Sequence, residues 1–153
     1  MSTAESKYPA GFIKKRKHAR DKAMQALYQL TVSKEEIDWV RDHYLNDQGV
    51  ASGDEEYFLE LLYKVHQNVA EIDAAFTVYV TSMENNLDPI EESILRIATY
   101  EFMHHLEIPF KVVINEAVNL ARTYGTDESH KFVNGVLDPL AKKLRPLEVS
   151  ATK

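Results

Sequence analysis

The sequence predicts an all-α protein with two helical lobes. Apolar residues recur at steps of three and four along almost the whole chain, as they do on one face of a helix. No segment shows the sustained apolar and polar alternation of a strand. With 153 residues, 44% of them hydrophobic, the chain is long enough to bury the core of one compact domain or of two small lobes.

The first helix is expected in KKRKHARDKAMQALYQ, residues 14–29. Ala19, Ala23 and Leu27 belong to its apolar stripe, while basic residues crowd its amino-terminal turns. Positive charge opposes the helix dipole at that end and costs up to about 1 kcal/mol per exposed charge at low salt. A role other than helix stability must therefore explain these basic residues.

Further helices are expected in the first lobe. Ser33, with Glu36 three positions later, has the spacing of a capping box and predicts a helix that ends near NDQG. A strongly helical ladder of apolar residues begins at Asp54, and the sequence allows a break in it near NVAEID.

The clearest interruption in the chain is SMENNLDP, residues 82–89, and we place the boundary between the lobes there. Asp88 and Pro89 suit the N-cap and the first position of a new helix. The expected organisation is a flexible amino-terminal tail, an amino-terminal helical subdomain, a carboxy-terminal helical subdomain and a carboxy-terminal tail, at residues 1–13, 14–84, 85–146 and 147–153.

Three helices are expected in the second lobe, in PIEESILRIATYEFMHHL, FKVVINEAVNLARTYG and TDESHKFVNGVLDPLAKKL. The tripeptide EIP separates the first two, and Gly125 is expected to end the second as a helix-terminating glycine. Thr126 or Asp127 is the expected cap of the third helix. Pro139 is expected to kink or restart that helix, and Pro146 to mark its end.

The charge of the chain is unevenly distributed. Residues 14–22 hold six basic side chains against one acidic one, a balance of +5, so the rest of the chain carries −11 to give the net charge of −6. A basic island on an acidic protein is typical of an element that binds a polyanion. The alternative is a solvated helix terminus with a few surface ion pairs.

Composition and motifs exclude several classes of protein. Without cysteine the chain forms neither disulfides nor thiolate metal sites, and we expect no metal and no cofactor. No apolar run approaches the roughly 18 residues of a membrane span and no secretory signal begins the chain, so a cytoplasmic location without membrane contact is expected. The chain has no His-Glu-x-x-His pair, Gly-rich phosphate loop or nucleophile elbow, so we expect no catalytic residue and no enzyme activity.

Three segments resemble the NusB family of transcription antitermination factors. The first, RKHARDKAMQALYQ, follows the pattern of the family's first helix. The others, ILRIATYE and VVINEAVNLARTYGTDESHKFVNGVLD, resemble its carboxy-terminal half and come in the same order. The residues that match in the first segment are Arg16, Ala19, Arg20, Ala23, Gln25, Ala26, Leu27 and Tyr28.

The resemblance implies an all-α fold of about seven helices in two packed helical subdomains. It also implies a bacterial, non-catalytic protein that pairs with the small-subunit ribosomal protein NusE. The pair binds the single-stranded boxA element of ribosomal RNA operon transcripts, and the antitermination complex keeps RNA polymerase from terminating. Family members occur as monomers and as homodimers. The alternative is a NusB-like RNA-binding or protein-adaptor module with a role in ribosomal RNA maturation.

The predicted RNA-binding residues lie in two places. At the start of the first helix Lys and Arg can neutralise phosphates, and Arg can also stack on or pair with unpaired bases. Arg16 and Arg20, four residues apart, are the strongest candidates. At the start of the last helix, free backbone donors favour an anion. The full set is Lys14, Lys15, Arg16, Lys17, Arg20, Lys131 and Phe132.

Phe132 allows two interpretations. An exposed ring could stack on an RNA base. The same residue also begins an apolar ladder with Val136 and Leu140, which predicts a core position. We expect exposure, because other apolar residues of this helix can form the buried stripe without it.

For the protein partner, the resemblance implies a surface that includes Tyr28 and Glu91. Helix statistics alone equally allow Tyr28 to be a half-buried core residue and Glu91 to be a first-turn acid that complements the helix dipole. The acidic remainder of the chain suits a basic ribosomal protein in either case.

Overall fold

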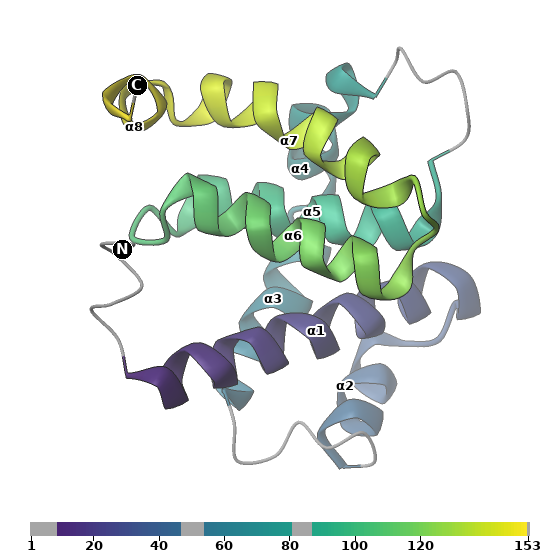
Figure 1. The fold of residues 1–153 in the computed structure, drawn as a ribbon. Coiled ribbons are helices and arrows are strands. Elements are labelled where there is room, and N and C mark those ends of the chain that lie inside the picture. Colours follow the sequence, from purple (N-terminus) through teal and green to yellow (C-terminus); the bar gives the residue numbers. More distant parts are fainter. Residues whose placement is uncertain (1–8, 47–53, 81–86, 153) are drawn as a thin grey trace. The chain divides into compact units, whose positions relative to one another are not determined.

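A computed structural model describes residues 9–46, 54–80 and 87–152 (Figure 1). Within these ranges the chain forms eight α-helices and one 3-10 helix and no β-strand, which confirms the predicted all-α fold. The elements in order are α1 (Ala10–Ser33), α2 (Ile37–Asn46), α3 (Glu55–Gln67), α4 (Val69–Phe76), η2 (Thr77–Tyr79), α5 (Pro89–His104), α6 (Phe110–Tyr124), α7 (Ser129–Leu144) and α8 (Pro146–Ala151).

The chain divides into two compact units, an amino-terminal unit that ends at Gln67 and a carboxy-terminal unit that begins at Asn68. The boundary expected from the sequence lies later, between residues 84 and 85, and the segment 81–86 falls outside the described residues. The difference comes from α4, which packs on α5 and α7. Its buried apolar residues continue the periodicity of α3, so sequence spacing alone assigns them to the preceding core.

In the amino-terminal unit α1 packs against α2 and α3. The apolar stripe predicted for α1 is confirmed, because Ala19, Ala23 and Leu27 are all buried. The helix begins at Ala10, so residues 10–13, which the sequence analysis assigns to a flexible tail, are helical. The remainder of that tail, residues 1–8, lies outside the described residues.

The predicted cap at Ser33 is wrong. Ser33 is the last residue of α1, and its hydroxyl donates a hydrogen bond to the carbonyl of Gln29 (2.8 Å). Lys34 then takes a left-handed conformation (φ 63°) that ends the helix, and α2 begins only at Ile37. A serine hydroxyl can pair with a helix carbonyl as well as with a helix N–H, so capping-box spacing does not decide between the two ends.

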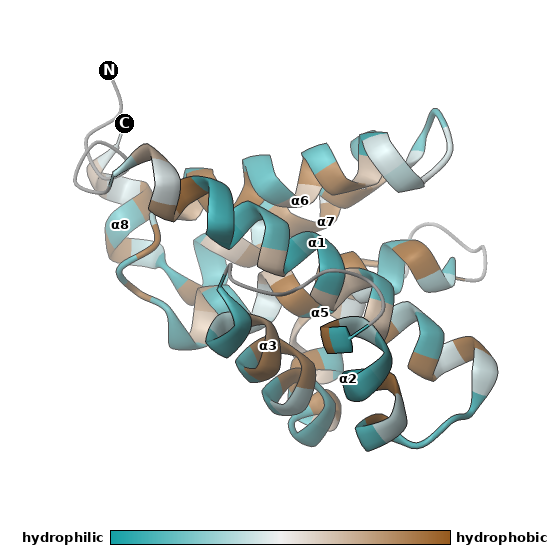
Figure 2. Cartoon of the chain, turned by 90° about the horizontal axis from the view of Figure 1, so that it is seen from below, coloured by the Kyte–Doolittle hydropathy of each residue, from teal (hydrophilic) through white to brown (hydrophobic). Residues whose placement is uncertain are grey.

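In the carboxy-terminal unit α5 packs against α4, α6 and α7. Nine of its sixteen residues are buried, within the run Ser93–Phe102. Apolar residues recur along each helix among polar ones (Figure 2). A helix that contacts three others needs an apolar surface wider than one stripe, which explains the density of aliphatic residues in ILRIATYE.

The start of α5 follows the prediction, whereas the turn between α6 and α7 does not. Asp88 Oδ1 accepts a hydrogen bond from Ile90 N (2.7 Å), the expected N-cap. Gly125 ends α6 but has φ −94°, and a Cβ there would lie 2.5 Å from the Ser129 side chain, so close approach requires glycine. The Ser129 hydroxyl accepts from Thr126 N (2.9 Å), and neither expected capping residue begins α7.

α7 continues as one helix through Pro139, so it does not restart there. Four buried residues flank the proline, and their burial outweighs the roughly 3 kcal/mol that an internal proline costs. They are Val136, Leu137, Leu140 and Ala141. Pro146 begins α8, so residues 147–151 of the expected carboxy-terminal tail are helical.

Arg145 connects the ends of three helices within the carboxy-terminal unit. Its side chain is 4% exposed, and its guanidinium donates to main-chain carbonyls around the end of α5 and to a carboxylate of α8. The acceptors are the carbonyls of Glu101 (3.1 Å), Phe102 (2.9 Å), His105 (3.0 Å) and Ile108 (2.9 Å) and the Glu148 carboxylate (2.7 Å). The other oxygen of Glu148 accepts from Phe110 N at the start of α6 (2.8 Å). Helix ends leave such groups unpaired, so this arrangement satisfies two ends together.

Candidate nucleic-acid interface

The exposed charge of the basic island comes from its lysines. Lys14, Lys15 and Lys17 are exposed on the amino-terminal turns of α1. At 100° per residue, their three positions span about 160° of the helix surface, on the side opposite Ala23 and Leu27. An anion that approaches α1 from solvent therefore meets ammonium groups first.

Arg16 is held inside the amino-terminal unit. Its Nε forms an ion pair with Asp54 Oδ2 at 2.5 Å. Its guanidinium carbon lies 3.9 Å from the centroid of the Tyr57 ring and 4.7 Å from that of Phe12. Asp54 also accepts from Tyr57 N (3.1 Å) at the start of α3, so Arg16 joins α1 to α3.

Arg20 lies deeper than Arg16. The residue is only 6% exposed, and its guanidinium carbon is 5.9 Å from the Tyr57 ring centroid. The two arginines chosen as the strongest RNA-binding candidates therefore both point to the same aromatic ring of α3. Their role in RNA binding stays a prediction, and their contribution to the folded unit is a second role that was not predicted.

A signal for this placement is present in the sequence. Positions 16, 20, 23 and 27 follow one another at steps of four, three and four, so both arginines share the stripe of Ala23 and Leu27. A long basic side chain on an apolar stripe packs its stem, and here also its guanidinium, against the core.

At the start of α7 the two predicted residues differ in exposure. The Lys131 side chain is 69% exposed and forms a loose ion pair with Glu128 (3.8 Å). Phe132 is half-buried, and the stripe beside it is formed by Val133 and Val136, both fully buried. Phe132 thus has neither the full exposure that we expected nor the core position of the alternative.

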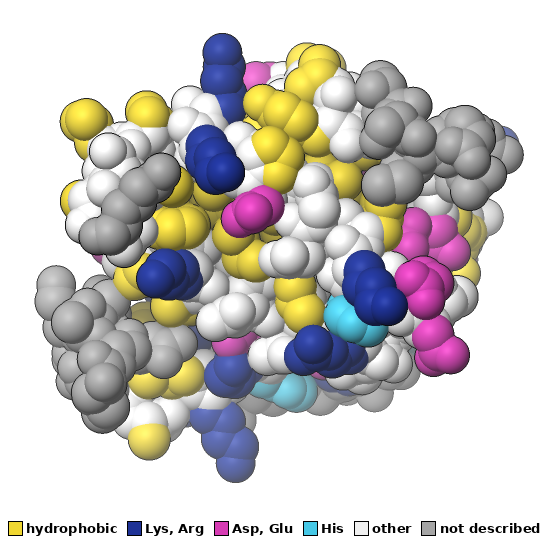
Figure 3. Space-filling view, turned by 45° about the horizontal axis from the view of Figure 1, so that its top comes forward, with side chains coloured by type: hydrophobic (Ala, Val, Ile, Leu, Met, Phe, Trp, Pro, Cys, Tyr) yellow, Lys and Arg dark blue, Asp and Glu magenta, His cyan; other side chains and the backbone are white. Residues whose placement is uncertain are grey.

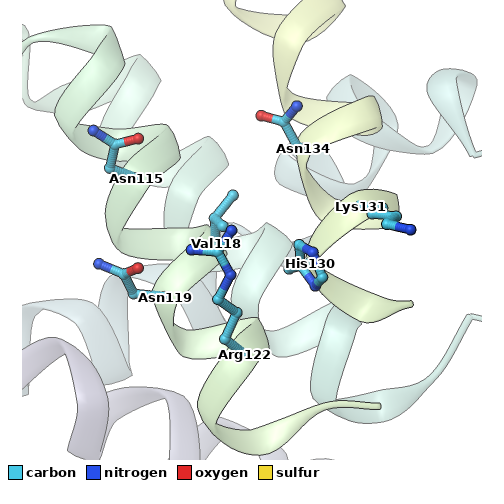
Figure 4. Close-up of a pocket in the computed structure, with 7 residues that line it drawn as sticks. All are labelled: Asn115, Val118, Asn119, Arg122, His130, Lys131 and Asn134. Carbon is cyan, nitrogen blue, oxygen red and sulfur yellow. The ribbon is translucent and has the colours of Figure 1, made fainter. Parts of the chain in front are cut away.

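An open pocket of about 550 Å³ lies between α6 and α7 (Figure 4). Asn115, Val118, Asn119 and Arg122 of α6 line it together with His130, Lys131 and Asn134 of α7. Of these residues, only Lys131 is among the RNA-binding residues predicted from the sequence. The signal for the others is the polar set Asn115, Asn119 and Arg122, which recurs at steps of four and three along one face of α6.

Figure 3 shows one face of the molecule, on which several Lys and Arg side chains lie apart from one another and others lie beside Asp, Glu or His side chains. Basic side chains gather in the island on α1 and in the pocket between α6 and α7.

Tyr28 and Glu91 are both half-buried. Tyr28 lies on α1 in the amino-terminal unit, and Glu91 in the first turn of α5 in the carboxy-terminal unit. Glu91 precedes a charge network in which Arg96 contacts Asp73 (2.8 Å) and Glu92 (3.3 Å). Burial raises the pKa of the Glu92 carboxyl, the charge of Arg96 opposes that shift, and the charge of Asp73 adds to it.

A metal-binding cluster and a membrane-spanning helix are both absent from the parts of the chain that the structure describes. In residues 9–46, 54–80 and 87–152, no group of three or more His, Cys, Asp or Glu side chains could hold a metal ion. Over the same ranges, none of the helices has the length and apolar character needed to cross a membrane.

Comparison with known proteins places most of the chain in one family of relatives. A model described as the NusB family matches residues 17–142. The transcription antitermination protein NusB of Pseudoalteromonas atlantica is 46% identical over 135 residues, which cover 88% of this chain and 96% of that relative.

Solved structures agree with the sequence comparison. T. maritima NusB superposes with a TM-score of 0.72 at 30% identity, over 84% of this chain and 91% of that one. A second structure contains the antitermination factors NusB and NusE in complex with dsRNA. Its matching chain has a TM-score of 0.76 at 25% identity and covers 85% of this chain and 98% of its own length.

Proposed function

This chain belongs to the NusB family, and we propose that it is a transcription antitermination factor that binds boxA-type single-stranded RNA of ribosomal RNA operon transcripts together with NusE. The observation that carries the proposal is the exposed cluster Lys14, Lys15 and Lys17 on a chain of net charge −6. Such a cluster attracts one polyanion to one place, while the acidic remainder repels it elsewhere.

The proposed RNA contacts lie in both predicted regions, one in each unit. The lysines of α1 supply phosphate contacts, and Arg16 and Arg20 can add to them after exchanging their internal partners. Lys131 and the half-buried ring of Phe132 form the second region, in which Phe132 offers part of its face to a base. The protein acts by binding and catalyses no reaction.

NusE is the proposed protein partner. The name of one structural neighbour pairs NusB with NusE and RNA, and Tyr28 and Glu91 are the residues of this chain that we assign to the NusE contact. The pair acts within an RNA polymerase antitermination complex in the cytoplasm, with the protein itself either a monomer or a homodimer.

A salt series tests the RNA proposal. Fluorescence anisotropy would measure binding of a boxA-like single-stranded RNA and of a double-stranded RNA of the same sequence, with and without NusE. If three to five basic residues contact phosphates, log affinity falls with log salt at a slope of about −2 to −3.5, because each single-strand contact contributes about 0.7. A slope near zero, or tighter binding to the duplex, contradicts the proposal. NusE binding without any RNA binding would instead support a protein adaptor.

A charge reversal tests the partner surface. Glu91→Lys places a positive charge on the side proposed to meet a basic ribosomal protein, so NusE affinity should fall while RNA binding by the isolated protein changes little. Glu71→Lys, at an exposed first-turn position of α4, is the matched control. Equal losses of NusE affinity in the two variants would remove Glu91 from the contact.

A further inference from the structure

The pocket between α6 and α7 is lined by six side chains that can donate hydrogen bonds and by one apolar side chain. Three asparagines, one arginine, one histidine and one lysine surround Val118, and none of the seven lining residues is acidic. This composition is unusual for a chain with 24 acidic against 18 basic residues. A lining of amide and cationic side chains favours an anionic ligand that also carries hydrogen-bond donors and acceptors.

Most of these side chains are available to a ligand. Among the described residues, the side-chain polar atoms of Asn115, Asn119, Arg122, His130 and Asn134 have no hydrogen-bond or ion-pair partner. Lys131 keeps only the loose contact with Glu128 at 3.8 Å. Binding a ligand here breaks no strong internal contact, whereas at Arg16 it must displace Asp54.

The amide and cationic side chains come from both helices of the pocket. Figure 4 shows Asn115 of α6 and Asn134 of α7 at one end, and Asn119, Arg122, His130 and Lys131 towards the other. An amide offers a donor and an acceptor together and can pair with the edge of a base. Guanidinium and ammonium groups bind phosphate, and an imidazole ring can stack on an unpaired base.

We propose that this pocket binds one unpaired nucleotide of an RNA strand. Arg122 and Lys131 hold its phosphate, and Asn115, Asn119 and Asn134 contact the edge of its base. The proposal rests on the RNA-binding function proposed above and extends it to five residues of the carboxy-terminal unit, Asn115, Asn119, Arg122, His130 and Asn134. An acidic peptide would satisfy the cationic end but would not need amides from both helices at the other.

The first test measures RNA affinity with matched variants. Arg122→Gln should weaken binding of the single-stranded RNA about fivefold at low salt and reduce the salt slope by about 0.7, the value of one phosphate contact. Lys143→Gln removes the same charge from an exposed position of α7 outside the pocket and should change affinity less than twofold. Asn134→Ala should weaken binding about tenfold without changing the slope, because it removes a base contact and no charge. Asn46→Ala, at an exposed helix position, is its control.

The second test observes the pocket directly. In ¹H–¹⁵N spectra, adding uridine or adenosine 5′-monophosphate should move the side-chain amide signals of Asn115, Asn119 and Asn134. Inorganic phosphate at the same concentration should leave them in place. Thermal unfolding of each variant checks that its fold is intact, which the exposed positions of Arg122 and Asn134 favour.

The outcomes separate the two proposals. If wild-type protein binds RNA with the expected salt slope but Arg122→Gln and Asn134→Ala match their controls, the pocket proposal is overturned and the proposed function stands. If phosphate and nucleotides act alike on the spectra, the pocket is a simple anion site and the nucleotide assignment is overturned. If wild-type protein binds no RNA at any salt concentration, both proposals fall.

Discussion

The amino-terminal and carboxy-terminal units use arginine in different ways. Arg16 has one carboxylate and two aromatic rings as partners, and its side chain keeps 25% of its exposure. Arg145 donates to five acceptors, four of them main-chain carbonyls, and its side chain is 4% exposed. The number of partners and the exposure of the side chain, and not the residue type, therefore distinguish Arg16 from Arg145.

The largest expected effect is at Arg145. Arg145→Ala should lower the free energy of unfolding by about 3–5 kcal/mol, because it leaves Glu148 and four buried or half-buried carbonyls without their partner. Urea unfolding measures the loss. Arg145→Lys keeps the charge but has three donors for five acceptors, so it should recover only part of it.

Lys143→Ala, two positions earlier and exposed, is the matched control and should change the unfolding free energy by less than about 0.5 kcal/mol. Equal effects of Arg145→Ala and Lys143→Ala would break the comparison between the two units.

The lysines of α1 should show the opposite pattern. Replacing Lys14, Lys15 and Lys17 together with Gln should reduce the salt slope of RNA binding by about 2, at about 0.7 per lost phosphate contact. Stability should change by less than about 0.5 kcal/mol, because the three side chains are exposed. A triple replacement of the exposed Lys111, Lys142 and Lys143 removes the same charge from the other unit, and an identical drop in slope would mean that only net charge matters.

Arg16 is expected to contribute both to stability, like Arg145, and to RNA binding, like the lysines of α1. A substitution of its partner Asp54 can separate these two roles. Arg16→Ala should cost about 1 kcal/mol of stability through the lost ion pair and ring contacts. Asp54→Asn keeps a residue that can cap α3 but frees the guanidinium, so RNA affinity should rise severalfold. Unchanged RNA affinity in Asp54→Asn, measured by anisotropy, would show that Arg16 serves the fold alone.

The smallest effect is expected at Glu92. Its pKa is raised from 4.5 in the folded protein, so the folded state holds this proton more tightly than the unfolded chain. The free energy of unfolding should therefore fall as pH rises above 4.5. The fall should be less than about 1 kcal/mol, because the Glu92 side chain is 23% exposed and solvent screens its charge. Glu92→Gln should remove this fall. Urea unfolding between pH 4 and 7, with Glu71→Gln as control, measures it. Parallel curves for wild type and Glu92→Gln would exclude the effect.

The sequence predicted correctly the features that depend on residues within a single helix or turn. The helical class, the apolar stripe of α1, the N-cap at Asp88 and the interruption at EIP all depend on residues within about four positions of one another. Helical geometry also explains why the lysines of α1 are exposed, since a basic residue opposite an apolar stripe faces solvent, while their role in RNA binding stays a prediction.

The tertiary structure alone decided what each side chain meets. Arg16 pairs with a residue 38 positions away and Arg145 with carbonyls 43 and 44 positions away, and spacing within one helix carries no information about such partners. The assignment of α4 to the carboxy-terminal unit, the continuation of α7 through Pro139 and the pocket between α6 and α7 depend in the same way on packing between helices. Periodicity determines which face of a helix is apolar, and only the fold determines which surface covers it.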